Sequence, residues 1–262
     1  MQINGIYSYN KNYTPQRKLS FTSSSREYHD PKLIGTSRTW GNIATTTWLF
    51  RQDLDWKNFV EFADNNFKNK KHINTHCLAC SDGSEAYSFI ITAMEKLPKD
   101  THRKYIPVTA IDRDLEIINF ARRGRINLSQ TDFGRLNIFT KFKNKYFQDK
   151  QPALQIKNDH FLERCASYKV NPELRNKVVF RRDNLLKYLS GIHDNGNSIV
   201  FCRNVTPYLS RDNVFTLANI AGSVLKKGSL IVFGEFDKHS GILDFIDVKG
   251  FEECMEYVFR KI

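Results

Sequence analysis

From about residue 45 onward, short apolar runs alternate with stretches in which apolar residues recur every three or four positions. Alternating apolar residues over 73–79 predict a strand, and the small polar residues that follow predict a turn into a helix. Apolar residues on one face of 87–97 define that helix, and Pro98 ends it. A second strand, 108–111, leads into a helix that Asp114 is expected to cap. The pattern up to this point is strand, helix, strand, helix.

The second half of the chain continues this alternation with more apolar strands. Continuous apolar runs at 178–180, 199–202 and 230–233 are typical of short strands with both faces buried. A helix is predicted between the last two, over about 212–226. The alternation predicts an α/β fold, with a mostly parallel sheet and helices on both faces. Residues 251–262 are expected to add a final edge strand, antiparallel if it returns by a hairpin.

Two regions lack a clear period. Residues 1–40 are rich in Ser, Asn, Thr, Tyr and basic side chains, so we expect a flexible basic arm there and the folded domain at 41–262. Residues 125–176 are basic and aromatic, and their spacing is too irregular to predict individual elements.

Composition indicates a folded chain with a surplus of positive charge. Hydrophobic residues make up 40% of the 262 residues and aromatic residues 13%, which excludes a wholly disordered chain. Lys and Arg number 40 and Asp and Glu 28, so the formal net charge is 40 − 28 = +12. This charge attracts acidic partners, which include nucleic acid, anionic membranes and acidic protein segments.

The sequence also predicts where in the cell the protein is located. No apolar run approaches the roughly 20 residues that span a bilayer, and the first residues lack the features of a signal peptide. The five cysteines are odd in number and widely spread, unlike a disulfide scaffold. We therefore expect a soluble cytoplasmic protein with free thiols and, by default, a monomer.

Candidate chemistry lies in the loops that follow the predicted strands, because an open parallel sheet binds ligands at the carboxyl ends of its strands. Residues 79–85 form a small-residue turn that opens a helix, where backbone N–H groups can approach a ligand closely. Asp112 ends the second strand, where nucleoside-binding sheets place a carboxylate for the ribose hydroxyls. Each feature alone is also explained by an ordinary turn or a helix cap.

Five blocks of sequence together resemble one known family. They read Thr-Thr-Thr-Trp-Leu-Phe-Arg at 45–51, Ala-Cys-Ser-Asp-Gly-Ser-Glu-Ala-Tyr-Ser at 79–88, Ala-Ile-Asp-Arg-Asp at 110–114, Asp-Asn-Leu-Leu at 183–186 and Phe-Cys-Arg-Asn-Val-Thr-Pro-Tyr-Leu at 201–209. Their order and rough spacing are similar to those of the CheR-type methyltransferases, over about residues 42–236. The resemblance implies a class I Rossmann-like fold, S-adenosyl-L-methionine as cofactor, and O-methylation of glutamate side chains on an acidic, receptor-like protein of chemotaxis.

The resemblance also implies roles for individual residues. The cofactor-binding positions it marks are Thr45, Thr47, Arg51, Glu85, Asp112, Asn184, Leu185, Arg203 and Asn204. Among these, Asp112 corresponds to the ribose acid, and Asn184 and Leu185 to the pair beside the adenine. Arg51 and Tyr208 are the candidate catalytic residues, since an arginine can hold carboxylates and the matching tyrosine lies near the transferred methyl group.

This sequence departs from the family pattern in three places. Thr45 stands where the family has Asn, and Ser84 stands where it has the first of two Glu. The basic helical domain that usually precedes the catalytic domain is replaced by the irregular arm. The first two departures imply a weaker grip on the amino acid end of the cofactor, and the third leaves the substrate less determined than the cofactor.

Three other interpretations stay open at this point. The basic, aromatic stretch 139–147 would suit RNA or DNA, and 204–208 is superficially similar to the Asn-Pro-Pro-Tyr motif of amino-methylating nucleic-acid enzymes, which predicts a nucleic-acid methyltransferase. The departures at Thr45 and Ser84 fit a non-catalytic module that binds S-adenosylmethionine. A zinc site has possible ligands in His72, His76, Cys77 and Cys80, but they fall on an alternating strand, so we expect no metal.

Overall fold

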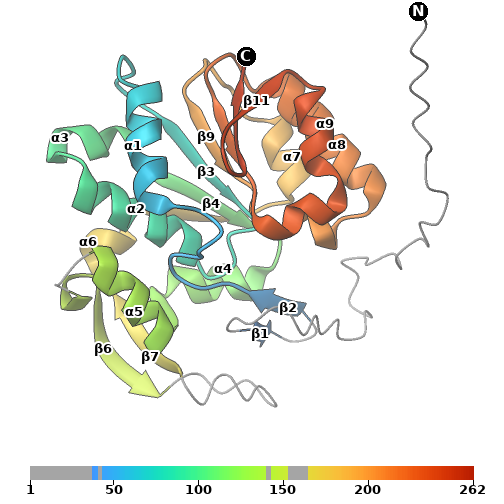
Figure 1. Ribbon diagram of the computed structural model, residues 1–262. Coiled ribbons are helices and arrows are strands. Elements are labelled where there is room, and N and C mark those ends of the chain that lie inside the picture. The colour runs from blue at the N-terminus through green and yellow to red at the C-terminus, as the bar shows by residue number, and fades with distance from the viewer. Residues whose placement is uncertain (1–36, 41–42, 140–142, 153–164) are drawn as a thin grey trace, which may run out of the picture.

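The computed structural model describes residues 37–40, 43–139, 143–152 and 165–262 (Figure 1). Its main sheet has seven strands in the order β11-β12-β10-β9-β3-β4-β8. Their bounds are β3 Asn74–Leu78, β4 Val108–Asp112, β8 Val178–Arg182, β9 Ser198–Phe201, β10 Leu230–Val232, β11 Phe251–Met255 and β12 Val258–Lys261. The pairs from β10 to β8 are all parallel, whereas β12 is antiparallel to both of its neighbours. The predicted mostly parallel α/β fold with an antiparallel final strand is confirmed.

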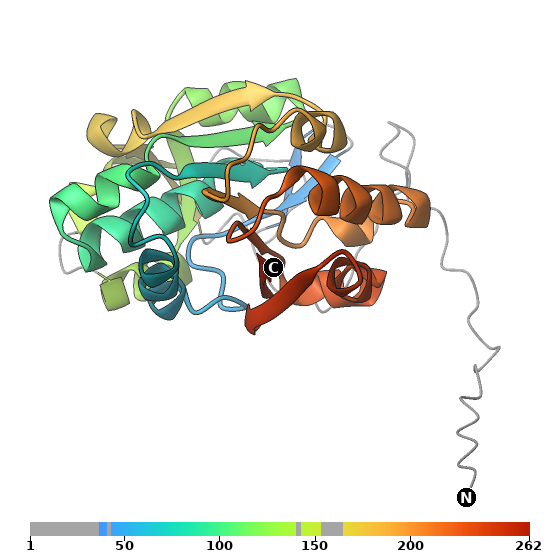
Figure 2. The same cartoon turned by 90° about the horizontal axis from the view of Figure 1, so that it is seen from above.

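Helices cover both faces of this sheet, as the separation of the blue and cyan helices from the orange and red ones shows in Figures 1 and 2. The helices are α1 Trp56–Asn66, α2 Ser84–Lys96, α3 Lys99–His102, α4 Leu115–Arg122, α5 Gln130–Phe139, α6 Pro172–Arg175, α7 Leu185–Ser190, α8 Arg211–Val224 and α9 Ile242–Asp247. Short 3-10 turns are η1 Arg103–Tyr105, η2 Lys143–Lys145, η4 Thr206–Tyr208 and η5 Glu235–Ser240.

Alternate side chains along the internal strands β3 and β9 enter two separate cores. On β3, Cys77 packs in the core that includes α1 and α2, and its neighbour Leu78 packs in the core that includes α8 and α9. Phe201 on β9 joins the first core, where Phe89 of α2 lies 5.2 Å from it between ring centroids. Val200 belongs to the second core. Burial on both faces explains why these strands appear in the sequence as continuous apolar runs.

Local signals in the sequence fix the ends of two helices. The Asp114 side chain accepts hydrogen bonds from the backbone N–H of Glu116 (2.8 Å) and Ile117 (3.4 Å), so it caps α4 as predicted. Helix α2 ends at Lys96, two residues before Pro98, which cannot continue a helix.

A small antiparallel sheet interrupts the α/β alternation. Its strands β5 Arg125–Ser129, β6 Phe147–Pro152 and β7 Cys165–Val170 pair in the order β5-β7-β6, and β6 and β7 lie beside α5 in Figure 1. The Lys145 ammonium donates to a carboxylate oxygen of Glu95 on α2 at 3.0 Å, and the Tyr146 hydroxyl donates to the same oxygen. Strand β6 is exposed after its first residue, which explains why the apolar period of this region is weak.

The tail and the edge strand differ from the sequence prediction. Residues 251–262 form two strands rather than one, and the final strand β12 lies inside the sheet while β11 forms the edge. Val258 and Phe259 are both buried, as expected of an internal strand. At the other edge, β8 is not buried on both faces, because Val179 is exposed.

The first described residues form a two-stranded hairpin. Strand β1 Ser37–Trp40 pairs antiparallel with β2 Ile43–Thr46, so the proposed boundary near residue 40 falls within a hairpin. The rest of the predicted arm, residues 1–36, lies outside the described residues.

Among the described residues, no helix is long and apolar enough to cross a membrane. The described cysteine side chains are free thiols.

Candidate functional site

The candidate site lies where the carboxyl ends of the parallel strands meet the segment that leads into α1. From β3 the chain moves to β4 and β8 on one side of the sheet, and it then returns to β9 and β10 on the other side. Strands β3 and β9 are neighbours, so the direction of strand order reverses between them. Open α/β sheets bind ligands at this point of reversal.

The turn after β3 brings backbone close to this point. Ala79 and Ser81 have φ of 53° and 51°, and Gly83 has φ of 89°. A Cβ at Gly83 would lie 2.7 Å from the Phe180 ring, so only glycine fits. Ser84 is fully buried, and its hydroxyl and backbone N–H both donate to Asp82 Oδ1, at 2.7 and 3.0 Å. Ser84 therefore serves the turn and adds no charge to the site.

Asp112 lies beside this turn at the end of β4. Its Oδ2 accepts from the Ser81 N–H and its Oδ1 from the Asp114 N–H, both at 3.0 Å. Burial raises the pKa of Asp112, and these hydrogen bonds act against that shift. Each oxygen keeps a further acceptor position, which fits the predicted role of binding ribose hydroxyls.

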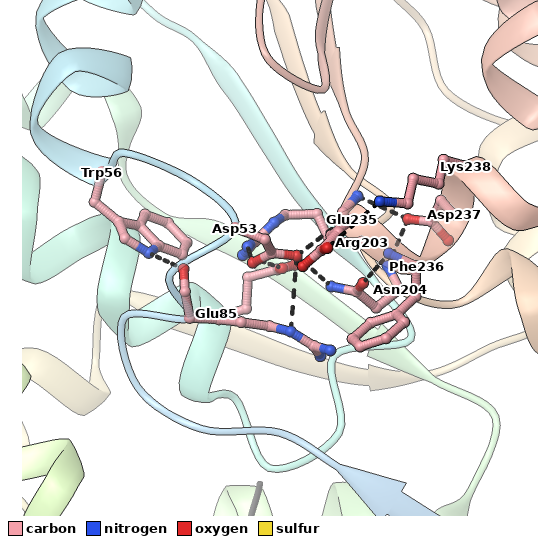
Figure 3. A network of polar contacts seen from close by, with 11 residues as sticks. Asp53, Trp56, Glu85, Arg203, Asn204, Glu235, Phe236, Asp237 and Lys238 are labelled. Atoms are coloured by element: carbon pink, nitrogen blue, oxygen red, sulfur yellow. Dashed lines mark hydrogen bonds and ion pairs between the residues drawn. The ribbon is translucent and has the colours of Figure 1, made fainter. Parts of the chain in front are cut away.

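Arg203, which follows β9, is buried in an ion-pair cluster (Figure 3). Its side chain is 2% exposed. Nη1 donates to Glu85 Oε2 at 3.1 Å, and Nη2 contacts Asp53 Oδ1. The guanidinium carbon also lies 5.0 Å from the centre of the Trp56 ring. Ion pairs from α2 and from the segment before α1 thus hold Arg203 in place.

Asn204 connects the loops after β9 and β10. Its Nδ2 donates to Asp53 Oδ2 at 2.9 Å, and its Oδ1 accepts from the Phe236 N–H at 3.0 Å. Its backbone N–H donates to the buried Asp237 at 2.6 Å. A Cβ at Gly234 would overlap the Asn204 side chain, so glycine is required where the two loops touch.

Asp53, which the sequence analysis did not select, lies at the centre of this network. Its side chain is 5% exposed, and its Oδ2 also accepts from the Glu235 N–H at 3.0 Å and lies 3.7 Å from Arg51 Nε. The sequence feature that could have indicated Asp53 is its charge, two positions after Arg51, in a segment whose apolar residues Leu49, Phe50 and Leu54 are buried. Its partners are far away in sequence, so no local pattern pointed to it.

The two carboxylates of the cluster have different charge states. Burial acts to raise the pKa of Asp53, but its attraction to Arg203 and Arg51 and the hydrogen bond from Asn204 lower it below the ordinary value. Burial raises the pKa of Glu85 to about 7, although Arg203 opposes the shift. Asp53 is thus firmly ionised, and Glu85 titrates near neutral pH.

Arg51 offers an unsatisfied donor to the site. Its guanidinium lies 4.3 Å from the Trp48 ring centre and 5.2 Å from that of Phe236, and its Nη2 is buried without a hydrogen-bond partner among the described residues. Burial lowers the pKa of Arg51, and Tyr208 lies close enough to act against this shift. A buried N–H without a partner is costly, so a carboxylate bound at this position would be favoured. This donor fits the amino acid end of S-adenosylmethionine, which carries a carboxylate.

The segment that carries Arg51 is anchored on both sides. The Leu49 N–H donates to the buried Asp132 of α5 at 3.2 Å, and the Phe50 N–H donates to the Ser88 hydroxyl of α2 at 2.8 Å. The Trp56 indole N–H donates to the Arg51 carbonyl at 3.1 Å. These bonds connect residues 47–53 to α5, α2 and α1.

The remaining predicted cofactor residues come from two other parts of the chain. Asn184 caps α7, because its Oδ1 accepts from two backbone N–H groups at 3.0 and 3.1 Å, and Leu185 packs against the second core. Their loop adjoins Asp112, whose carbonyl accepts from the Asp183 N–H at 3.0 Å. Thr47 directly follows β2, and the Thr45 side chain lies outside the described residues. Their roles toward the cofactor stay predictions.

The residues considered for zinc are used in other ways. His76 Nδ1 hydrogen-bonds the Tyr188 hydroxyl at 2.8 Å, and Cys77 and Cys80 are buried thiols whose pKa values are raised by burial. Within the part of the chain that the structure describes, no group of three or more His, Cys, Asp or Glu could hold a metal ion.

An open sheet with a small-residue turn, an acidic strand end and a buried arginine cluster defines a nucleotide-type cofactor-binding α/β protein. Residues 45–247 match the family model described as "CheR methyltransferase, SAM binding domain". The chain therefore belongs to the CheR methyltransferase family and is an S-adenosylmethionine-dependent methyltransferase. The resemblance, the fold and the cofactor expected from the sequence are confirmed.

Curated relatives agree with this assignment. Chemotaxis protein methyltransferase 2 of Vibrio cholerae serotype O1 is 23% identical over 214 residues, which cover 80% of this chain and 68% of that protein. A chemotaxis protein methyltransferase of Borreliella burgdorferi is 25% identical over 182 residues, or 70% of this chain and 56% of that protein. A second Vibrio cholerae protein, chemotaxis protein methyltransferase 1, is 27% identical over 67% of this chain and 58% of its own length. The match thus covers only 56% to 68% of the relatives' lengths.

Proposed function

We propose that this chain methylates the carboxylate of a glutamate side chain on an acidic protein in the cytoplasm. The observation that carries the proposal is the buried Arg51 Nη2 donor, which has no hydrogen-bond partner within the part of the chain that the structure describes, in a domain of the CheR family. The relatives named chemotaxis protein methyltransferase support a receptor-like protein as substrate. The net charge of +12 supports an acidic partner, because opposite charge speeds the encounter.

Little chemical assistance is needed for this reaction. When bound, S-adenosylmethionine supplies a methyl group on a positively charged sulfur, which is a good leaving group. An ionised glutamate is already a competent nucleophile, so the site needs no strong base. The glutamate oxygen would take the methyl group while the carbon–sulfur bond breaks toward sulfur, and the products would be a methyl ester and S-adenosylhomocysteine. Alignment is therefore the main contribution of the protein.

Three parts of the site would hold the cofactor. The cluster of Glu85, Arg203 and Asn204 would hold the amino acid end, together with Thr45 and Thr47 from the N-terminal segment. Asp112 would accept the ribose hydroxyls, and the loop at Asn184 and Leu185 would lie beside the adenine. Glu85 is suited to an ammonium group, because it carries a full negative charge once it loses its proton.

Arg51 and Tyr208 would orient the reacting groups. Arg51 presents a donor that can take a carboxylate, and both the cofactor and the glutamate acceptor carry one. Tyr208 follows the cluster on η4, and its hydroxyl can hydrogen-bond the acceptor. A change at Arg51 that mainly raises Kd for the cofactor would assign the donor to the cofactor. A change that mainly lowers kcat would assign it to the acceptor.

A transfer assay with methyl-labelled S-adenosylmethionine tests the proposal on two acceptors, acidic protein and RNA. Label on protein that is released by mild base is the expected result, because carboxyl methyl esters hydrolyse readily. Base-stable label on RNA would show the alternative nucleic-acid reaction. Cofactor binding without transfer to either acceptor would show a binding module that has lost turnover.

A further inference from the structure

We propose that Asp53 is a positioning residue for the amino acid end of the cofactor. It would act through Arg203 and Asn204, because it fixes both side chains from the segment that precedes α1. This inference rests on the proposed assignment of these two residues to the cofactor.

The geometry gives Asp53 this role because three separate segments meet at its carboxylate (Figure 3). Oδ1 contacts Arg203 of the loop after β9, and Oδ2 accepts from Asn204 Nδ2 at 2.9 Å. Oδ2 also accepts from the Glu235 N–H of the loop after β10, at 3.0 Å. Both oxygens are thus occupied and the side chain is only 5% exposed. Asp53 is therefore placed to orient ligand-binding residues and has little room to bind the ligand itself.

The charges explain why a carboxylate is needed there. Arg51 and Arg203 bring two positive charges into a buried cluster, and Asp53 and Glu85 balance them. Ser84, which precedes Glu85 in the turn, adds no charge to the cluster, because its hydroxyl donates to Asp82. Without Asp53, only Glu85 would face the two guanidinium groups in this cluster. The arginines would then repel each other and move apart.

Asp53 also influences the titration of Glu85. The groups that act on Glu85 are Arg203 and Arg51, which lower its pKa, and Asp53, which raises it. The neutral thiols of Cys77, Cys80 and Cys202 surround the same carboxyl group. Removal of the Asp53 charge removes a like-charge repulsion, so the pKa of Glu85 should fall.

The experiment compares two ligands that differ only at the amino acid end. S-Adenosylhomocysteine has this end, and 5′-methylthioadenosine lacks it. In Asp53→Asn we expect Kd for S-adenosylhomocysteine to rise about tenfold or more, and Kd for 5′-methylthioadenosine to stay within about twofold. The midpoint of the pH dependence of S-adenosylhomocysteine binding should fall by about 0.5 to 1 pH unit. Isothermal titration calorimetry between pH 5.5 and 8.5 measures all three quantities.

Two further variants control for folding. Asp194→Asn changes another buried carboxylate, which accepts from Ser198 Oγ, Ser229 Oγ and the Lys226 N–H at the opposite end of the strands. It should leave both Kd values and the pH midpoint unchanged. Asp53→Glu keeps the charge but displaces it, so it should restore the pH midpoint and still weaken S-adenosylhomocysteine binding. This variant carries the test if Asp53→Asn does not fold.

The outcomes separate the inference from the proposal on which it rests. The role of Asp53 would be overturned if Asp53→Asn raised Kd equally for both ligands. It would also be overturned if the variant left the pH midpoint of S-adenosylhomocysteine binding unchanged. Wild-type affinity for S-adenosylhomocysteine in Asp53→Glu would also overturn it. If Arg203→Met weakens neither ligand in the otherwise wild-type protein, the assignment of Arg203 to the cofactor has failed instead.

Discussion

Glu85, which we propose binds the ammonium group of the cofactor, should make the protein less stable as the pH rises. Its pKa is about 7 in the folded protein against 4.5 for the unperturbed group. The folded state therefore binds a proton more tightly than the unfolded state does. The favourable contribution of the protonated group is complete below pH 4.5 and is lost as the pH rises toward 7.

The size of the effect follows from these two values. In the linkage relation, ionisation of Glu85 costs the folded state about 1 kcal/mol at pH 5 and about 3 kcal/mol at pH 8. Glu85→Gln keeps the shape of the side chain and cannot ionise. Without cofactor, its unfolding free energy relative to wild type should therefore increase by about 2.5 kcal/mol between pH 5 and pH 8.

Urea denaturation of both proteins at several pH values between 5 and 8 measures this difference. Glu116→Gln, at an exposed position in the first turn of α4, is the matched control and should change the unfolding free energy relative to wild type by less than about 1 kcal/mol over this pH range, since an exposed charge there interacts only weakly with the helix dipole. Parallel curves for Glu85→Gln and wild type would refute the reasoning. Binding should show the opposite trend, because the ammonium group of the cofactor needs the ionised carboxylate. Wild-type Kd should rise below pH 7, whereas Glu85→Gln should bind weakly at all pH values.

Three other changes test separate parts of the site. Asp112→Ala should raise Kd for S-adenosylmethionine about tenfold or more, because it removes the proposed ribose acceptor and also the acceptor of the Ser81 N–H; calorimetry that finds equal affinity would contradict the assignment. Gly83→Ala should destabilise the fold by about 1–3 kcal/mol in denaturant titrations, since φ is 89° and the new methyl group would meet Phe180. Tyr208→Phe should lower kcat with little change in cofactor affinity, and a change confined to Kd would place its hydroxyl on the cofactor.

Regular features of the sequence are enough to predict the parallel strands of the main sheet. Continuous apolar runs marked the internal strands β9 and β10, because both of their faces are buried. Asp114 and Pro98 marked helix ends through local hydrogen bonding and backbone geometry. Strand β6 gave no such signal, because its exposed residues impose no apolar period.

The candidate site was only partly predictable. Resemblance selected Arg51, Glu85 and Arg203, and the structure brings all three into one cluster. Asp53 was missed because its partners Arg203 and Asn204 lie 150 and 151 positions away along the chain. Such contacts depend on how the loops after β9 and β10 fold back, which no spacing within one segment can specify.

The anchoring of residues 47–53 has a consequence for how a ligand is recognised. The N–H groups of Leu49 and Phe50 are held by Asp132 and Ser88, two side chains that belong to the folded protein itself. The backbone beside Arg51 is therefore held by the protein's own side chains. Fixing one residue of a free chain costs about 1–2 kcal/mol in conformational entropy, and this cost is met during folding rather than during binding. Arg51 is thus held on a rigid backbone. Little backbone entropy is lost when it binds a carboxylate, so most of the free energy of that contact contributes to the binding affinity.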